Sequence, residues 1–274
     1  MTDAINNATA QSIAAMATAA LEVKHVEKTF GLVIPQGHQF KDLTAEVEKA
    51  EPAPYRHKGT VQLGDVASLL AYCADQAAQA TGYIYADTDG RLLTAIFNDT
   101  KAGPGWRDHR AVFKAELTPE AKKWLEHDGA NHAFTQSEFA EFIEDNFADL
   151  QGEEAKNLLT VATTISATTG INFASAKRLQ DGQVQLVYNE TIDAKAGADG
   201  QMKIPKLFTI GLQLFKGAKN ADLFTARLKY RLHSGSVKFW YELERPTKVI
   251  EVAFAEYVAQ VSKDSGYTVL HGKA

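Results

Sequence analysis

The densest set of side chains suited to chemistry lies between residues 103 and 150, which hold two Trp and three His. His127 and Asp128 are adjacent and His109 lies upstream, an order that resembles the metal ligands of phosphohydrolases. His132 extends the set, but two His with four residues between them, one a glycine, lack the fixed geometry of two His on one helix. A metal-dependent hydrolase that uses these four residues is one hypothesis.

The same residues also have a structural interpretation, which we prefer. Residues 127–129 end a predicted helix, where an imidazole interacts favourably with the helix dipole and a glycine commonly terminates the helix. His109 falls in or beside a predicted strand, so it does not project from a helical bundle as such ligands do. We therefore expect no catalytic residue, no bound metal and no cofactor.

Two further groups suggest catalysis but have a simpler explanation. Asp108 and His109 place a carboxylate beside an imidazole, as in acid–base catalysis. Adjacent residues on a strand face opposite sides, however, so residues 108–110 are interpreted as an anchor for the loop near Trp106. The single thiol, Cys73, lies on the apolar stripe of a predicted helix and is expected to be buried and inert. The sequence contains no motif for a nucleophilic serine, phosphate cradle or dinucleotide site.

Basic and aromatic residues alternate in the last third of the chain. Basic groups interleaved with aromatic rings bind single-stranded nucleic acid through phosphate contacts and base stacking. Any half-buried sheet shows the same alternation, with aromatic residues inside and charges outside, and we prefer this interpretation. The basic residues are Lys203, Lys206, Lys216, Lys219, Arg227, Lys229, Arg231, Lys238 and Arg245, and the aromatic residues are Phe208, Phe215, Phe224, Tyr230, Phe239, Trp240 and Tyr241. The possible nucleic-acid or partner surface consists of Lys206, Arg227, Lys229, Arg231, Lys238 and Arg245.

Hydrophobic periodicity and turn residues predict the elements that position these groups. Strands are predicted over residues 58–62, 83–86, 92–97, 110–117, 172–179, 183–192, 206–215, 223–232 and 237–243. Helices are predicted over residues 64–79, 119–126, 154–167 and 249–262, with a further helix that begins at residue 136. Tight turns are predicted at residues 181–182 and 234–235, where an acidic or hydroxyl residue precedes a glycine.

Local signals mark several boundaries. Thr118 and Pro119 are an N-cap and a first helical position, and Thr135 with Glu138 forms a capping box. The buried stripe of the helix that follows is predicted to be Phe139, Phe142, Ile143 and Phe147. Seven acidic residues between 138 and 154, with no basic residue among them, are interpreted as a solvated helix face, with a metal pair or a DNA-mimicking surface as alternatives.

A hairpin turn is predicted at residues 87–90, with the glycine at a positive φ angle. The aspartates of this turn resemble part of a calcium loop. The other calcium ligands are missing, so we interpret the segment as a turn.

The order of elements predicts an α+β fold with antiparallel sheets and hairpins, packed helices, a C-terminal helix and an N-terminal helical arm. Residues 1–30 are predicted to be an arm that is helical or disordered, either frayed or docked on a neighbouring subunit. Residues 31–274 are predicted to be a single body. Within this body, residues 58–167 are the helix-rich half and residues 171–274 the antiparallel β-rich half.

Composition narrows the class of protein. With 45% hydrophobic residues over 274 positions, the chain has enough apolar side chains for a full core. The net charge of −5 argues against a dedicated nucleic-acid binder, and a single cysteine excludes a disulfide framework. Neither a secretory signal nor a membrane span is predicted, so we expect a cytoplasmic protein without a membrane partner.

Seven blocks of sequence together resemble one family. They are KGTV (58–61), WRDHRA (106–111), TPE with W and HDG (118–129), QSEFAEFIEDN (136–146), GQVQLVYNE (182–190), IPKLFTIG (204–211) and WYELERPTKVIE (240–251). From about residue 31 onward, the chain resembles the YfdQ-like family of phage and prophage proteins, a domain of unknown function. The resemblance implies a role in phage or prophage biology in the bacterial cytoplasm, and it assigns no catalytic residue.

These observations support three hypotheses of function. The first is a non-enzymatic phage protein that acts as a homo-oligomer. No catalytic group is evident, the N-terminal helix could dock on a neighbouring subunit, and the long β-hairpins could extend an adjacent sheet. The second is an accessory protein of phage recombination or replication that binds single-stranded nucleic acid. The third is the metal-dependent hydrolase described above.

Overall fold

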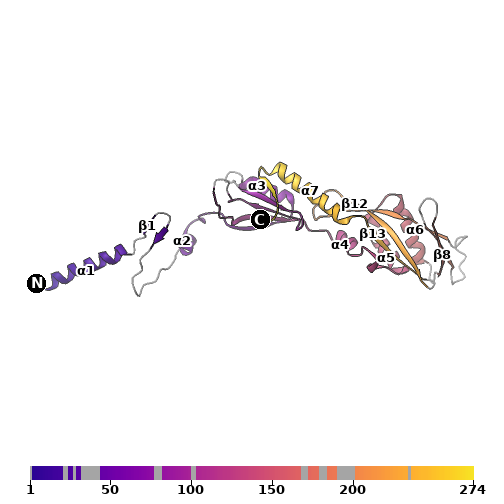
Figure 1. The fold of residues 1–274 in the computed structure, drawn as a ribbon, viewed down its shortest axis with the longest axis horizontal. Helices are drawn as coiled ribbons and strands as arrows, with labels where there is room; N and C mark the ends of the chain where they lie inside the picture. The colour runs from indigo at the N-terminus through magenta and orange to yellow at the C-terminus, as the bar shows by residue number, and fades with distance from the viewer. Residues whose placement is uncertain are drawn as a thin grey trace. The chain divides into compact units, whose positions relative to one another are not determined.

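The computed structural model describes residues 2–20, 24–26, 29–31, 44–76, 82–99, 103–167, 172–178, 184–189, 201–233 and 236–274. The chain forms two compact units, Met1–His57 and Lys58–Ala274 (Figure 1). In the first unit, helix α1 spans Thr2–Ala20 and carries a single charged residue, Asp3. Strands β1 (Lys24–Val26) and β2 (Thr29–Gly31) pair antiparallel, and helix α2 spans Thr44–Ala50.

A five-stranded mixed sheet lies in the second unit. Its strands are β3 (Gly59–Leu63), β4 (Tyr83–Asp87), β5 (Leu92–Ile96), β6 (His109–Lys114) and β14 (Thr268–His271). The order across the sheet is β14-β4-β5-β6-β3. The β4–β5–β6 meander is antiparallel, and its β4–β5 pair is the hairpin that the turn residues predict, whereas β14 and β3 pair parallel with β4 and β6. Neither parallel pair is predicted from the sequence.

Two helices cover one face of this sheet. Helices α3 (Val66–Gln76) and α7 (Pro246–Asp264) lie against each other there (Figure 1). Leu69 and Cys73 of α3 and Phe254 of α7 are fully buried. The apolar stripe predicted for residues 64–79 is therefore confirmed up to Gln76, and the last three residues of that prediction lie outside the described residues.

A four-stranded antiparallel sheet lies at the other end of the second unit. It runs in the order β13 (Ser236–Leu243), β12 (Asp222–His233), β11 (Leu207–Leu212) and β7 (Leu150–Gln151). Helices α4 (Pro119–Glu126), α5 (Gln136–Asp145) and α6 (Glu153–Ala167) accompany it, and both α5 and α6 contact its strands. Their apolar residues share one core with the inner face of the sheet.

The predicted helix caps are confirmed. The Thr118 hydroxyl accepts a hydrogen bond from the Ala121 amide at 3.2 Å, with Pro119 at the first helical position. The capping box is complete, because the Glu138 carboxylate also accepts a hydrogen bond from the Thr135 amide at 2.8 Å. These caps satisfy amide groups that a helix leaves without partners in its first turn.

A third, three-stranded antiparallel sheet is described by its backbone. It consists of β10 (Gln201–Ile204), β9 (Val184–Asn189) and β8 (Asn172–Arg178), in that order. The β8–β9 pair confirms the predicted hairpin, with a register shift between Phe173 and Ser175. The turns predicted at residues 181–182 and 234–235 lie outside the described residues.

The segment between α4 and α5 closes the outer edge of β13. The Gly129 amide donates to the Tyr241 carbonyl at 2.8 Å, and Phe134 and Phe239 exchange two backbone hydrogen bonds of 2.7 and 3.0 Å. A short 3₁₀ helix, η2 (Ala130–His132), lies between these contacts. An edge strand normally presents unpaired amides and carbonyls, so this segment shields β13 from pairing with another strand.

Trp124 is the centre of the core at this end of the unit. Its side chain is fully buried against Phe142, Phe208 and Tyr241, with ring centroids 4.9 to 6.3 Å apart. Its indole nitrogen donates to the Asp149 carboxylate at 2.8 Å, at the end of the 3₁₀ helix η3 (Phe147–Asp149). Its carbonyl, one of those that the end of α4 leaves without a helical partner, accepts a 2.6 Å hydrogen bond from the Tyr241 hydroxyl.

The predicted α+β class is confirmed, with several local corrections. The positive φ angle predicted for Gly90 lies at the next residue, Arg91 (52°). The Gly90 amide donates a hydrogen bond to the Asp87 carboxylate at 3.1 Å, as in a turn closed by an aspartate. Phe147 is 36% exposed because it lies beyond the end of α5 and does not belong to its buried stripe.

The C-terminal helix is confirmed, but it is longer than predicted and is followed by a strand. Helix α7 begins directly after Arg245, with Pro246 at its first turn, and β14 then joins the five-stranded sheet. Among the described residues, no helix is long and apolar enough to cross a membrane.

We expect Tyr241→Phe to lower the free energy of unfolding by about 1–2 kcal/mol, because it leaves the buried Trp124 carbonyl without a partner. Tyr230→Phe is the matched control, since Tyr230 lies on the neighbouring strand and its hydroxyl has no hydrogen bond within the described residues. Urea unfolding followed by Trp fluorescence measures both variants. Equal stability of Tyr241→Phe and the wild type would contradict the role given to this hydrogen bond.

Candidate functional site

The predicted basic and aromatic residues separate onto the two faces of the four-stranded sheet and its flanks. Phe208, Phe215, Phe224, Phe239 and Tyr241 are each at most 2% exposed. The outward-facing residues of β12 are Arg227, Lys229 and Arg231, which alternate with buried or half-buried neighbours. The aromatic residues are thus mostly core, and the basic residues are surface.

Two of these basic side chains are neutralised by ion pairs across the sheet. The Arg227 guanidinium lies 2.8 Å from the Glu244 carboxylate, and the Lys229 amine lies 3.5 Å from the Glu242 carboxylate. Such half-exposed pairs contribute less than about 1 kcal/mol to stability. Their effect here is to remove net charge from the middle of the sheet face.

The other end of the same face carries two basic residues opposite each other. Arg231 on β12 lies directly opposite Lys238 on β13, and like charges in this position repel each other. The Arg231 guanidinium lies 5.7 Å from the centre of the Trp240 ring, within the range of a cation–π interaction. Within the described part of the chain, neither cation forms an ion pair. We call Arg231, Lys238 and Trp240 the basic corner.

Lys206 and Arg245 do not join this corner. Lys206 precedes Leu207, which pairs with Arg227, so alternation directs Lys206 away from the face that carries Arg227. Arg245 lies seven residues after Lys238, about 23 Å along an extended strand, where it adopts a left-handed backbone before α7. The six predicted surface residues are therefore not one continuous patch.

His127 and Asp128 have structural partners. The His127 ring nitrogen Nδ1 lies 2.8 Å from the Lys123 carbonyl, and the ring stacks on Phe134 with centroids 5.6 Å apart. The Asp128 carboxylate accepts a hydrogen bond from the Leu243 amide at 2.8 Å, next to the segment that closes β13. His132 lies in η2, with its ring 6.1 Å from that of His127.

His109 lies apart from the other two His, on the five-stranded sheet. It is buried on β6, where its Nε2 atom lies 3.0 Å from the Tyr72 hydroxyl and its ring contacts Phe97. Among the described residues, no group of three or more His, Cys, Asp and Glu is arranged to hold a metal ion. The structure therefore does not bring together the four residues of the hydrolase hypothesis.

The residues around His109 tie a loop to the sheet. The side-chain amide of Asn98 donates a hydrogen bond to the Asp108 carboxylate at 2.7 Å, and the Arg110 side chain donates one to the Arg107 carbonyl at 2.7 Å. Arg107 has a positive φ angle of 56° and lies 3.2 Å from the Asp99 carboxylate. Trp106 is 78% exposed on this loop. These contacts are those of a loop anchor.

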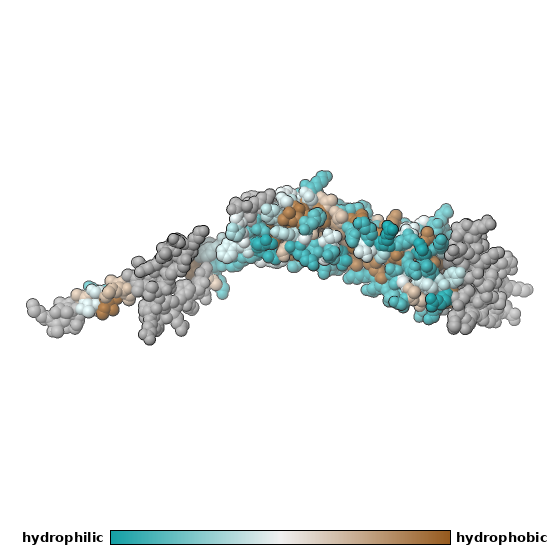
Figure 2. Space-filling view, viewed as in Figure 1, coloured by the Kyte–Doolittle hydropathy of each residue, from teal (hydrophilic) through white to brown (hydrophobic). Residues whose placement is uncertain are grey.

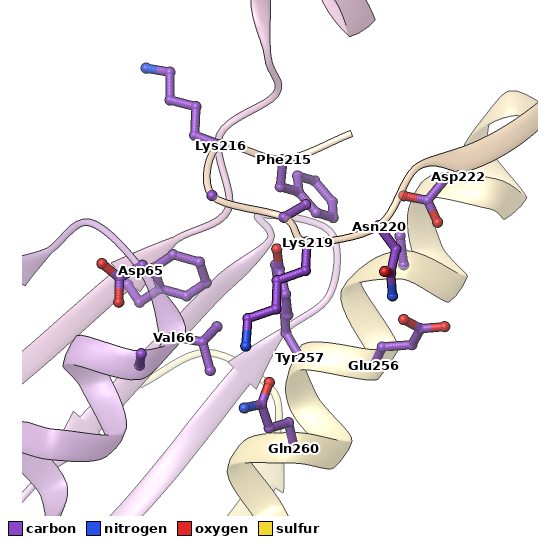
Figure 3. A pocket seen from close by; sticks show the side chains of 15 residues that line it. Asp65, Val66, Phe215, Lys216, Lys219, Asn220, Asp222, Glu256, Tyr257 and Gln260 are labelled. Carbon is purple, nitrogen blue, oxygen red and sulfur yellow. The ribbon is translucent and has the colours of Figure 1, made fainter. Parts of the chain in front are cut away.

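A pocket that the sequence does not predict lies between α3, β6, α7 and the loop from β11 to β12 (Figure 3). Its volume is about 390 Å³, and it combines aromatic walls with polar side chains. Of its three rings, Phe113 and Phe215 are buried and Tyr257 is half-buried. The charged residues of the lining are Asp65, Lys216, Lys219, Asp222 and Glu256. The sequence gives one indication of this pocket, which is the helical spacing of residues 253, 256, 257 and 260 that places them on one face of α7. The other lining residues come from segments far apart in the sequence.

One of the two lysines that line the pocket is already paired, because the Lys216 amine lies 2.6 Å from the Glu116 carboxylate. Burial, and then the nearby Glu256 carboxylate, raise the pKa of Asp222 above its usual range. Burial raises the pKa of Tyr257 as well, with smaller contributions from the same two carboxylates. Asp65, at the other side of the pocket, accepts a 2.7 Å hydrogen bond from the Ser68 amide and so serves as a helix cap. Asp222 and Glu256 are therefore the acidic groups left for a ligand.

Cys73 is not a nucleophile in this fold. The thiol is fully buried on α3, and this burial raises its pKa from 9.0 to about 11. Because the folded-state pKa is raised, the thiol contributes stability that is complete below pH 9 and is lost as the pH rises towards 11.

We expect the wild type to lose about 1–1.5 kcal/mol more unfolding free energy between pH 8 and pH 10 than Cys73→Ala does. Urea unfolding at each pH measures this difference, and any constant cost of the substitution cancels in the comparison. A parallel pH dependence of the two proteins would show that the Cys73 thiol is accessible to water in the folded state.

Comparisons with known proteins place the chain in a family. No curated protein and no solved structure matches it. One family model, described as "Uncharacterized conserved protein (DUF2303)", matches residues 3–274 and thus includes the N-terminal helix, which the resemblance in the sequence did not cover. The chain therefore belongs to the DUF2303 family of uncharacterized conserved proteins.

Proposed function

We propose that this protein is a non-enzymatic phage or prophage protein of the bacterial cytoplasm that acts as a homo-oligomer held together through α1. The resemblance to YfdQ-like proteins supports the phage context. The observation that carries the proposal of self-association is the exposure of apolar side chains on α1, where Ile13 is 58% and Met16 is 66% exposed. Figure 2 shows apolar residues on the described part of this helix.

The composition of α1 supports a helix that packs against another element. After Asp3 it has no charged residue up to Ala20, so no salt bridge between its side chains stabilises the surface of an isolated helix. Helices of this length are marginal in water unless an apolar face is buried. Ile13 and Met16 are three residues apart and therefore share one face.

A second copy of the same helix fits this face. The surface is uncharged, so two identical helices meet without repulsion, and the many Ala residues allow their backbones to approach closely. A two-fold contact between identical surfaces is the commonest way in which soluble proteins self-associate. The shielded edge of β13 leaves little opportunity for association through that strand.

We expect Ile13→Asp and Met16→Asp to reduce the native mass of the full chain towards that of one subunit, because each buries a charge in the helix contact. Gln11→Asp is the matched control, since it adds the same charge on the opposite face of α1. Light scattering over a wide range of protein concentrations measures the mass. A wild type that stays monomeric throughout would overturn the proposal.

The basic corner supports a second candidate function, the binding of single-stranded nucleic acid in phage recombination or replication. Arg231 and Lys238 offer two cations without an ion-pair partner in the described residues, and Trp240 offers a half-buried ring two residues after Lys238 on the same strand. This combination suits two phosphates and one stacked base.

Under this second proposal, we expect Arg231→Gln with Lys238→Gln to lower the salt dependence of oligothymidylate binding, with the slope of log K against log salt falling by about 1.4. Arg227→Gln with Lys229→Gln removes the same charge from side chains that are already paired, and it should change the slope much less. Gel retardation at several salt concentrations measures both. Failure of the wild type to bind at low ionic strength would remove this candidate.

A further inference from the structure

The pocket described above has the size and lining of a ligand site. Its volume of about 390 Å³ falls within the range of about 300–1,000 Å³ that small-molecule sites occupy. Such sites are mainly apolar with a few polar groups that fix orientation. Phe113 and Phe215 belong to the pocket lining, and Tyr257 extends into the pocket from α7 (Figure 3).

The charged groups of the pocket are unevenly placed. Asp222 and Glu256 lie on one side, whereas the Lys219 side chain extends towards Val66 and Gln260 (Figure 3). Within the described part of the chain, neither the Asp222 nor the Glu256 carboxylate forms a hydrogen bond or an ion pair. Lys219 therefore does not neutralise the two carboxylates.

We infer that this pocket binds a small organic cation, in which an amidinium, guanidinium or ammonium group meets Asp222 and Glu256 and an apolar or flat body lies against the half-buried Tyr257 ring. A planar cation presents several N–H donors to carboxylates at once. The same charge is attracted to the face of a Tyr ring, and here Tyr257 is that ring.

The charge balance of the pocket agrees with this assignment. Two carboxylates brought together without a counterion repel each other, and the raised pKa of Asp222 reflects its burial and this repulsion. A bound cation replaces the missing counterion, so cation binding and ionisation of Asp222 favour each other. Affinity is therefore expected to rise with pH until Asp222 is fully ionised.

The test uses the full chain and two probes of the same shape, benzamidine, which is a cation, and benzamide, which is neutral. We expect titration calorimetry or NMR to detect binding of benzamidine and at least tenfold weaker binding of benzamide. Asp222→Asn and Glu256→Gln keep the size of each side chain and should each weaken benzamidine binding by about three- to tenfold. Glu251→Gln removes the same charge from α7 outside the pocket lining, and it should leave binding unchanged.

Three results would overturn the inference. They are equal binding of the two probes, unchanged binding in both pocket variants, and displacement of benzamidine by millimolar Mg²⁺, which would make the pair a metal site. Native mass measured on the same samples separates this inference from the proposed self-association, because neither pocket variant alters α1. A monomeric protein that binds benzamidine would refute the oligomer alone, and an oligomer that does not bind it would refute the pocket alone.

Discussion

The hydrogen bond between the Tyr241 hydroxyl and the Trp124 carbonyl joins helix α4 to the four-stranded sheet. Helix α4 ends at this point, and its last carbonyls need partners that the helix itself cannot provide. Tyr241 satisfies one of them from β13, while the Trp124 indole reaches Asp149 just before β7. One buried aromatic residue thus fixes the end of a helix and both outer strands of the four-stranded sheet. In the low-dielectric interior, each of these polar groups would be costly without its partner.

The residues that most resembled an active site prove to be part of the same arrangement. His127 caps the end of α4, Asp128 accepts from the Leu243 amide, and the backbone from Gly129 to Phe134 covers the edge of β13. His, Asp and Gly occur together here because each can satisfy exposed backbone groups or turn the chain. The same chemical properties that suit these residues to catalysis also suit them to finishing helix ends and sheet edges.

The sequence predicted what depends on neighbours along the chain. The caps at Thr118 and Thr135 and the stripe at Phe139, Phe142 and Ile143 depend on residues within one or two turns, so spacing alone revealed them. The parallel partners of β4 and β6 and the pocket around Asp222 depend on segments far apart in the sequence. The pattern of residues within any one of these segments does not predict that the segments lie together in the fold. The basic corner is intermediate, because alternation predicted its exposure and only the register showed which charges remain unpaired.

The parallel pairing of β14 with β4 affects how the chain folds while it is being translated. Residues 268–271 lie beside residues 83–86, so the five-stranded sheet gains its outer strand only after nearly all of the second unit has been translated. Helix α7, which covers the apolar face of that sheet, also arrives late. Until then, the β4–β5–β6 meander has one open strand edge, and its apolar face is covered by α3 alone, a state in which nascent proteins are prone to aggregate.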